Sequence, residues 1–202
     1  MFDRYLRRLK DRCLAPLART LGPHISPDAV TWLACVVGVA CAAAAADDRM
    51  GLALGLWLVN RVLDGLDGTL ARVHGRESAF GAYLDIVLDF VVYAAIPVAL
   101  VARQPTPTLA TAGMLLLAAF YVNGASWMYL AAILEQRREG AASRGEATAV
   151  AMVPGVVGGA ETIAFYIAFF LWPSQQARLF QAMTVLLLVN VVFRLLWGKR
   201  HL

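Results

Sequence analysis

The sequence predicts an all-α integral membrane protein, a bundle of six transmembrane helices preceded by a basic amphipathic helix at the membrane interface. Of the 202 residues, 60% are hydrophobic and 16% are charged, and the mean hydropathy is +0.63. Soluble domains are nearer half apolar and a quarter charged. Six apolar stretches are long enough to cross a hydrocarbon core of about 30 Å as helices. We therefore expect a single membrane domain over residues 1–202, with the six-helix bundle over residues 29–197.

The N-terminal residues 1–22 predict a helix that lies in the headgroup plane. Apolar residues recur at helical spacing from Phe2 to Leu17, and arginine and lysine occupy much of the remaining surface. This pattern is typical of interfacial helices, whose apolar face enters the membrane while the basic face meets anionic headgroups.

Turn-forming and charged residues separate the six predicted spans. Pro173 and the pair Pro105 and Pro107 mark turns on one side of the membrane. The spans are predicted at residues 29–46, 52–71, 79–101, 109–134, 148–172 and 177–197.

The loop charges predict that both termini are cytoplasmic. Thirteen lysine and arginine residues fall in the N-terminal segment, two loops and the C-terminus, which all lie on one side of the predicted bundle. The other side carries only Arg49, Arg103 and Arg178. Cytoplasmic loops of membrane proteins are enriched in these residue types. Membrane orientation thus explains the net charge of +4, and we expect no nucleic-acid partner.

Several carboxylates lie within the apolar spans. Asp64 and Asp67 fall in the second span, Asp85 and Asp89 in the third, and Glu161 in the fifth. On insertion scales one aspartate at the centre of a membrane helix costs about 3 kcal/mol. A bound cation, a water-filled cavity or both must offset that cost.

The spacing of the four aspartates predicts that they converge. Residues three or four apart share a helix face, so Asp64 pairs with Asp67 and Asp85 pairs with Asp89. The loop at 73–80 is short, so we expect antiparallel neighbours with both pairs within about 10 Å of the cytoplasmic end. Hard carboxylate oxygens suit Mg²⁺ or Mn²⁺, and we expect two ions. The site would face the cytoplasm of a multi-pass protein in the cell (inner) membrane.

Small residues and one arginine surround the acids. Gly65, Gly68, Ala71 and Gly81 leave room for a ligand near the backbone, and Arg72 supplies a cation suited to phosphate. Glycines alone also occur where membrane helices pack tightly. Beside four acids and an arginine, they predict a pocket for metal and pyrophosphate.

The acids and their neighbours form one continuous motif. Residues 64–89 read DGLDGTLARVHGRESAFGAYLDIVLD. This run fits D-x-x-D-G-x-x-A-R-x(8)-G-x-x-x-D-x-x-x-D at all eight fixed positions, and it resembles the signature of the CDP-alcohol phosphatidyltransferase family (class I CDP-alcohol phosphotransferases). The six spans, the basic N-terminal helix and the segment SPDAVT at the start of the first span resemble that family too.

The resemblance implies a metal-dependent phosphotransferase. Such an enzyme transfers a phosphatidyl group from CDP-diacylglycerol to the hydroxyl of a small alcohol and releases CMP in phospholipid biosynthesis. The resemblance implies that Asp64 and Asp85 bridge two metal ions, and that Asp67 completes the first site and Asp89 the second. It also implies that Asp89 is the general base and that the protein is a homodimer.

A donor site follows from the same resemblance. Its implied residues are Asp28, Ala29, Val30, Thr31, Gly68, Ala71, Arg72, Ser78 and Gly81. The acyl chains of the donor would remain in the bilayer while its headgroup reaches the pocket. The expected partners are therefore a CDP-alcohol, CDP-diacylglycerol foremost, together with a small alcohol acceptor and membrane lipids.

The predicted acceptor follows from a difference between this chain and relatives that use phosphate-bearing acceptors. Relatives with phosphate-bearing acceptors end the fourth span with a pattern like K-x-R-x-E, where this chain has Ala131, Ile133 and Glu135. Burying a phosphate dianion without a cation is costly, so we expect a neutral or amine-bearing acceptor. Glu161 and Thr162 are further acceptor-site candidates, because an intramembrane glutamate marks function by default. A structural hydrogen bond from Glu161 to the backbone of a neighbouring helix, or to Thr162, is the equal alternative.

Other functions fit the sequence less well. Within the family, the alternative is a phosphatidylglycerophosphate or cardiolipin synthase. A membrane transporter also uses intramembrane carboxylates, but it usually has inverted repeats and broken helices, and the sequence shows neither. Membrane prenyltransferases carry their aspartate motifs on separate helices without this frame of glycine, alanine and arginine.

Overall fold

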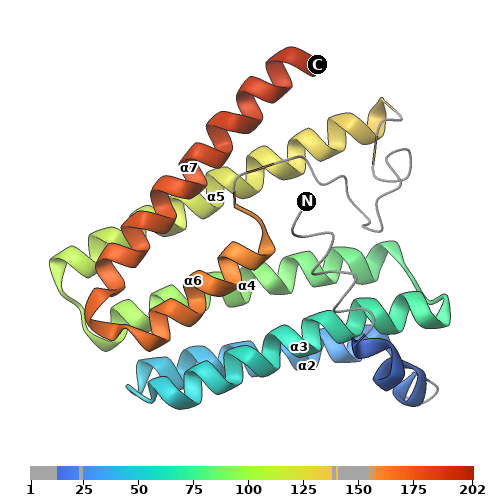
Figure 1. Cartoon of the computed structure of the whole chain (residues 1–202), viewed down its shortest axis with the longest axis horizontal. Helices are drawn as coiled ribbons and strands as arrows, with labels where there is room; N and C mark the ends of the chain where they lie inside the picture. The colour runs from blue at the N-terminus through green and yellow to red at the C-terminus, as the bar shows by residue number, and fades with distance from the viewer. Residues whose placement is uncertain (1–12, 23–24, 138–139, 141–154, 156) are drawn as a thin grey trace. The chain divides into compact units, whose positions relative to one another are not determined.

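The chain is helical over the part that the structure describes, as predicted, and contains no strand there (Figure 1). The structure is a computed structural model, and its described residues form two compact units, Met1–Pro105 and Thr106–Leu202. The described residues are 13–22, 25–137, 140, 155 and 157–202.

The first unit contains three long helices, α2 (Pro27–Ala46), α3 (Met50–His74) and α4 (Ala79–Arg103). Helix α2 packs against both α3 and α4. The two acid-bearing helices were expected as direct neighbours across a short loop. Side chains of the two helices do meet, as Arg61 of α3 bonds Asp89 of α4, and both helices also pack against α2, which contributes side chains to the space between them.

Side-chain caps fix where the helices of this unit begin. The Ser26 hydroxyl accepts a hydrogen bond from the Ala29 N–H at the start of α2, and the Ser78 hydroxyl accepts one from the Gly81 N–H at the start of α4. Serine satisfies N–H groups that lack helical partners, which makes it a preferred first residue. Helix α3 ends at Gly75, whose φ of 62° lies in the left-handed region that glycine adopts most easily.

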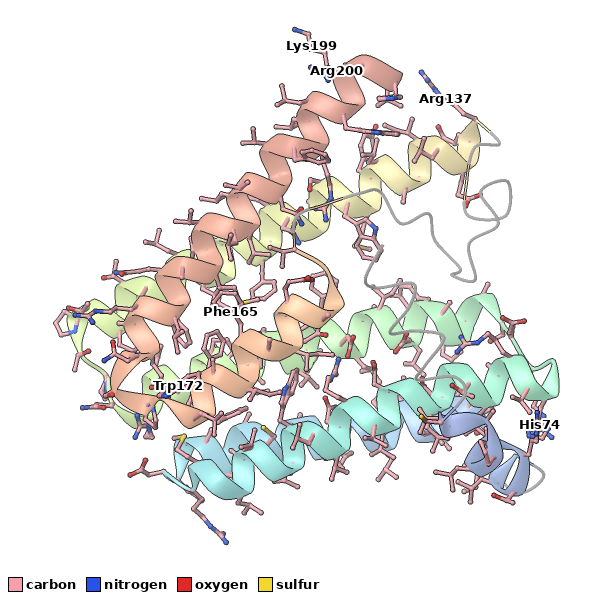
Figure 2. All side chains as sticks on the ribbon, in the orientation of Figure 1. His74, Arg137, Phe165, Trp172, Lys199 and Arg200 are labelled. Atoms are coloured by element: carbon pink, nitrogen blue, oxygen red, sulfur yellow. The ribbon has the colours of Figure 1, made fainter. Side chains whose placement is uncertain are left out.

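The predicted interfacial helix is described only from residue 13 onward, and residues 1–12 lie outside the described part. Residues 13–21 are helical and contact α2 and α3 through an apolar cluster. His74, labelled in Figure 2, hydrogen-bonds the Ala18 carbonyl, and Arg76 donates to the Gly22 carbonyl. The segment is therefore fixed to the end of α3. The cluster comprises Ala18, Val30, Leu66 and Leu70, with Leu14, Leu21 and Leu63 packed against it.

The second unit contains α5 (Pro107–Gln136), α6 (Gly159–Leu171) and α7 (Gln176–His201), with a 3₁₀ turn over Pro173–Gln175. Helices α5 and α7 lie side by side (Figure 1). The predicted fifth span began at residue 148. The described helix begins at Gly159, and residues 148–154 lie outside the described part.

Basic residues gather at one end of the second unit. Figure 2 shows Arg137 at the end of α5, and Lys199 and Arg200 at the end of α7. The Arg137 guanidinium donates hydrogen bonds to the carbonyls of His201 and Leu202, and so satisfies backbone acceptors at the end of α7. This grouping agrees with the charge pattern used for orientation, and the cytoplasmic location of the termini stays a prediction.

Four described helical stretches are long and apolar enough to cross a membrane. They are Pro27–Ala46, Ala79–Arg103, Pro107–Gln136 and Pro173–His201. Helix α3 is 25 residues long but carries charged side chains, and α6 has 13 residues. The count of six spans therefore stays a prediction for these two helices.

Gly38 marks the closest approach of α2 to its neighbours. A Cβ atom added there would lie 2.5 Å from Val92 Cγ2 and 3.1 Å from Asn60 Nδ2. Val92 is buried and β-branched, so it has little freedom to move away. Small residues let membrane helices pack closely in this way.

We predict that Gly38→Ala destabilises the protein by about 1–3 kcal/mol, because the added methyl group overpacks the junction of three helices. Gly55→Ala is the matched control, since Gly55 is also inside a helix and has open space around its Cα. It should be neutral or stabilising by up to about 1 kcal/mol through helix propensity. Thermal unfolding in detergent measures both, and equal melting temperatures for the two variants would contradict the packing.

Candidate active site

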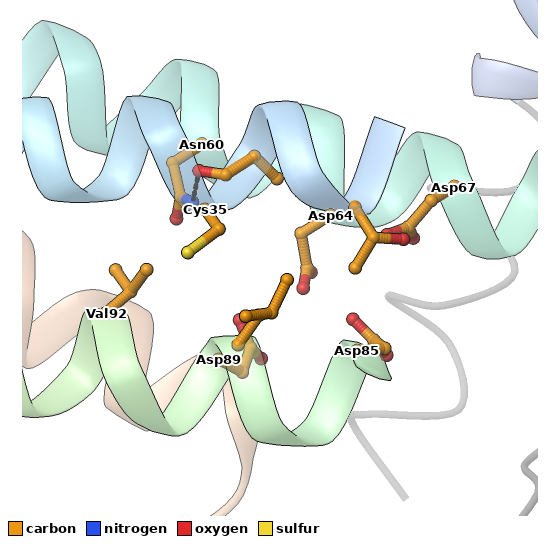
Figure 3. A pocket seen from close by; sticks show the side chains of 10 residues that line it. Cys35, Asn60, Asp64, Asp67, Asp85, Asp89 and Val92 are labelled. Atoms are coloured by element: carbon orange, nitrogen blue, oxygen red, sulfur yellow. Dashed lines mark hydrogen bonds between the residues drawn. The ribbon is translucent and has the colours of Figure 1, made fainter. Parts of the chain in front are cut away.

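A pocket opens between the three long helices of the first unit (Figure 3). Helix α2 supplies one wall, α3 the second and α4 the third. All four aspartates of the motif line this pocket, so the predicted convergence is found in the structure. The lining residues are Thr31, Ala34, Cys35, Asn60, Asp64, Asp67, Asp85, Leu88, Asp89 and Val92.

Three of the acids form a possible metal centre. Asp64, Asp85 and Asp89 each offer one carboxylate oxygen, and these oxygens lie within 4.8 Å of one another. Figure 3 shows Asp64 pointing across the pocket toward the two acids of α4. Oxygens bound to one Mg²⁺ ion lie about 3–4 Å apart, so small side-chain rotations bring this set onto a divalent ion. The donor set therefore fits Mg²⁺ or Mn²⁺.

Asp67 lines the same pocket but is held differently. Its side chain is buried, and Oδ2 accepts a 2.7 Å hydrogen bond from the Thr31 hydroxyl of α2. Its Oδ1 accepts a hydrogen bond from the Gly68 N–H. Thr31 was expected in the donor site, and its contact with a motif acid was not predicted. Helix α2 thus orients one of the four carboxylates directly.

The Arg72 side chain lies over Gly68. A Cβ atom at Gly68 would lie 3.2 Å from Arg72 Nη1, so glycine leaves the guanidinium room to lie along α3. Arg72 Nη2 also donates to the Thr69 hydroxyl at 3.5 Å. The half-buried Ala71 precedes the arginine and adds little bulk. Arg72 therefore places a positive charge near the end of α3, the helix that also carries Asp64 and Asp67.

The starts of α2 and α4 meet at Gly81. A Cβ atom there would lie 3.0 Å from the Ser78 hydroxyl and 3.1 Å from Asp28 Oδ1. Three predicted donor residues are therefore brought together. The other two predicted donor residues at the start of α2 lie on different faces of the helix. Val30 is buried in the apolar cluster, and Ala29 is exposed.

Arg61 belongs to this site and was not predicted. Its Nη2 lies 2.8 Å from Asp89 Oδ1, and its Nη1 lies 3.7 Å from Asp64 Oδ1. The side chain is 8% exposed. An arginine three residues before Asp64 in an apolar span is a signal that could have revealed it, because intramembrane charges mark functional sites.

The predicted acceptor residues lie in the second unit. Glu161 occupies the first turn of α6 and its Oε2 accepts a 2.8 Å hydrogen bond from the Gly158 N–H, while the Thr162 hydroxyl donates to the Gly158 carbonyl. Glu161 therefore caps the start of its own helix. This is a structural contact, but its partner is Gly158 and not the neighbouring helix or Thr162 of the structural alternative. Glu135 is exposed in the last turn of α5. A role in acceptor binding stays a prediction for all three candidates.

A second intramembrane arginine was also missed. Arg194 of α7 is 8% exposed and donates through Nη1 to Asn123 Oδ1 at 2.6 Å and to the Ser126 hydroxyl at 3.2 Å. Its Nε has no hydrogen-bond partner within the described part of the chain. The second unit therefore contains a buried cation between α5 and α7.

Sequence comparison places these residues within a known family. Residues 24–196 match the sequence model of the CDP-alcohol phosphatidyltransferase family. The chain is 34% identical over 178 residues to the inner membrane protein YnjF of Escherichia coli (strain K12), which is 86% of this chain and 84% of that protein. It is 37% identical over 81 residues to phosphatidylinositol phosphate synthase of Cutibacterium acnes, which is 39% of each chain.

Solved structures share the fold. The crystal structure of Mycobacterium tuberculosis phosphatidylinositol phosphate synthase (PgsA1) with CDP-DAG bound has a TM-score of 0.69 at 22% identity, and covers 91% of this chain and 92% of that chain. The PgsA1 complex with manganese and citrate has a TM-score of 0.70 at 21% identity, and covers 90% and 87%. At these identities the likeness establishes the architecture.

We predict that Asp64→Asn weakens Mn²⁺ binding by more than about tenfold, because it removes a charged oxygen from the centre of the cluster. Asp48→Asn is the control: Asp48 lies in the turn before α3, pairs with Arg103, and has a positive φ that asparagine tolerates. Titration of the purified protein with Mn²⁺, followed by electron paramagnetic resonance, measures both. Equal affinity in the two variants would remove Asp64 as a ligand.

Proposed function

The chain belongs to the CDP-alcohol phosphatidyltransferase family, and we propose that it transfers a phosphatidyl group from CDP-diacylglycerol to the hydroxyl of a small alcohol. Family membership makes it a phosphotransferase rather than a transporter. One observation carries the proposal for the site: oxygens of Asp64, Asp85 and Asp89 lie within 4.8 Å of one another inside a helical pocket.

The four acids would hold two divalent ions, Mg²⁺ or Mn²⁺, which would neutralise the pyrophosphate and the departing CMP. Asp64 and Asp85 would be shared between the two ions, and Asp67 and Asp89 would each contribute to one of them, as the family resemblance implies. The structure of PgsA1 in complex with manganese and citrate supports a divalent metal ion as the cofactor.

Asp89 acts as the general base. It accepts the proton of the acceptor hydroxyl as that oxygen forms a bond to the phosphorus of the phosphatidyl group. The bond from this phosphorus to the oxygen shared with CMP breaks, and CMP leaves with that oxygen. Phosphoryl transfer depends mainly on positioning and charge stabilisation, which suits a site of fixed acids with an adjacent cation.

The donor headgroup binds at the starts of α2 and α4 and at the end of α3. Arg72 contacts phosphate, and Gly68 gives its guanidinium room. Asp28, Ser78 and Gly81 border the nucleotide, with Gly81 keeping the approach open. Thr31 contributes indirectly, because its hydroxyl holds Asp67. The backbone of Ala29 and Val30 contributes to the shape of the donor site. The CDP-DAG bound in one PgsA1 crystal structure supports this class of donor.

The protein works as one multi-pass domain of the inner membrane with its site toward the cytoplasm. The family match over residues 24–196 includes helices of both units, and a relative is named an inner membrane protein. The basic ends of α5 and α7 support the orientation. The protein is also proposed to be a homodimer, because the family resemblance implies one.

The acceptor is a neutral or amine-bearing alcohol. Ala131 is fully buried and Ile133 is half-buried. Both side chains are apolar, so neither supplies the positive charge that a phosphate would need. One observation favours a second candidate, a phosphate-bearing alcohol: a relative that matches 39% of this chain is a phosphatidylinositol phosphate synthase.

An acceptor panel tests the proposal. Purified protein with CDP-diacylglycerol and Mn²⁺ should release CMP only when an alcohol is added, and the lipid product identifies the acceptor. We expect turnover with inositol, glycerol, serine or ethanolamine. Turnover confined to glycerol 3-phosphate and inositol phosphate would overturn the neutral acceptor in favour of the second candidate, and metal-independent CMP release would overturn the mechanism.

We predict that Asp89→Asn lowers turnover by about 10²–10⁴-fold, because the amide cannot accept the proton. Binding of CDP-diacylglycerol should remain measurable, since three aspartates and Arg72 are still present. CMP release and donor binding are measured on the same preparation, with Asp48→Asn as the control outside the pocket. A variant with near-normal turnover would remove Asp89 as the base.

A further inference from the structure

Arg61 is held in a closed cage beside the acids. Its Nε donates to Asn60 Oδ1, and its Nη1 donates to the Tyr93 hydroxyl, each at 2.8 Å. The guanidinium carbon lies 4.6 Å from the ring centre of Trp57 and 5.1 Å from that of Tyr93. Contacts on the ring faces and in the guanidinium plane fix both position and orientation.

The cage aims the guanidinium at two acids on different helices. Arg61 Nη2 donates to Asp89 Oδ1 of α4 at 2.8 Å, and Nη1 lies 3.7 Å from Asp64 Oδ1 of its own helix α3. Both acids belong to the set whose oxygens lie within 4.8 Å of one another. Like charges at such distances repel strongly in a medium of low dielectric constant.

We propose that Arg61 is a positioning residue for Asp89 and the permanent counter-charge that keeps Asp64 and Asp89 together before metal binds. One oxygen of Asp89 is fixed by the guanidinium, so the carboxylate enters the reaction with a defined orientation. This inference rests on the proposed function, because it assigns Arg61 to the metal-dependent site. It is distinct from a packing role, in which the cage would only fill space between α3 and α4.

Metal dependence of stability separates these two roles. A counter-charge matters most when no metal is present, since divalent ions neutralise the same acids. A packing residue contributes equally in both states. At a given metal concentration, a ligand stabilises the folded state more when it binds that state more tightly. The variant that lacks the counter-charge should therefore gain more stability from metal.

The experiment compares melting temperatures of the full-length protein in detergent, in EDTA and in saturating Mn²⁺. Arg61→Gln should lower the melting temperature in EDTA and recover most of the loss in Mn²⁺, so its metal-induced rise exceeds that of the wild type. Its Mn²⁺ dissociation constant should fall on the order of tenfold, because a repelling cation has gone. Arg61→Lys keeps the charge and should show a rise like that of the wild type.

Tyr93→Phe is the matched control within the cage. It removes the hydroxyl that accepts from Arg61 and leaves the cation in place. Its melting temperature should change equally in EDTA and Mn²⁺. An equal loss for Arg61→Gln in both conditions, or a weaker affinity for Mn²⁺, would overturn the inference.

Two further outcomes are decisive. If Arg61→Gln does not fold in EDTA, the double variant Arg61→Gln with Asp89→Asn should fold there, because the uncompensated charge is absent. Failure of that double variant would point to packing and overturn the inference. A wild-type protein that Mn²⁺ neither binds nor stabilises would overturn the metal site itself, and this result is distinguishable because it is seen without any substitution.

Discussion

Mutual repulsion among carboxylates is the constraint around which the first unit is organised. Asp64, Asp85 and Asp89 bring oxygens within 4.8 Å of one another in helices that are otherwise apolar. Such a group is stable only beside positive charge. Arg61 supplies one charge from within the protein, and divalent ions supply the rest in the proposed enzyme. The same concentration of negative charge that makes the group costly would give it affinity for divalent cations.

Helix α2 makes this arrangement possible because it packs on both acid-bearing helices. Its Thr31 orients Asp67, and its Gly38 lets the backbone approach Val92 and Asn60 closely. Residues of α2 also complete the lining of the pocket beside the acids of α3 and α4. The small and apolar residues of α2 therefore help to set the positions of the two acid-bearing helices.

The four acids could be predicted because their spacing follows helix geometry and their motif is continuous in sequence. The count of lysine and arginine in loops could not reveal Arg61 and Arg194 as site residues, since this count covers only residues outside the spans. Both were visible as basic residues within apolar stretches. The position of Glu161 within its helix was missed for a different reason: hydrophobicity extended the predicted span upstream, whereas the described helix starts at Gly159 and makes this glutamate a cap. Long-range contacts such as Thr31 with Asp67 need the fold, because no local pattern encodes them.

The contact between Thr31 and Asp67 also shows how near one of the acids lies to the start of a helix. Thr31 is five residues from the cap Ser26, so at 1.5 Å per residue the bonded acid sits about one and a half turns below the beginning of α2. In the proposed enzyme, a water-soluble alcohol would therefore need to pass only this short length of helix to reach the acids. The acyl chains of the proposed donor would stay in the bilayer, and the CMP product would leave toward the same helix ends.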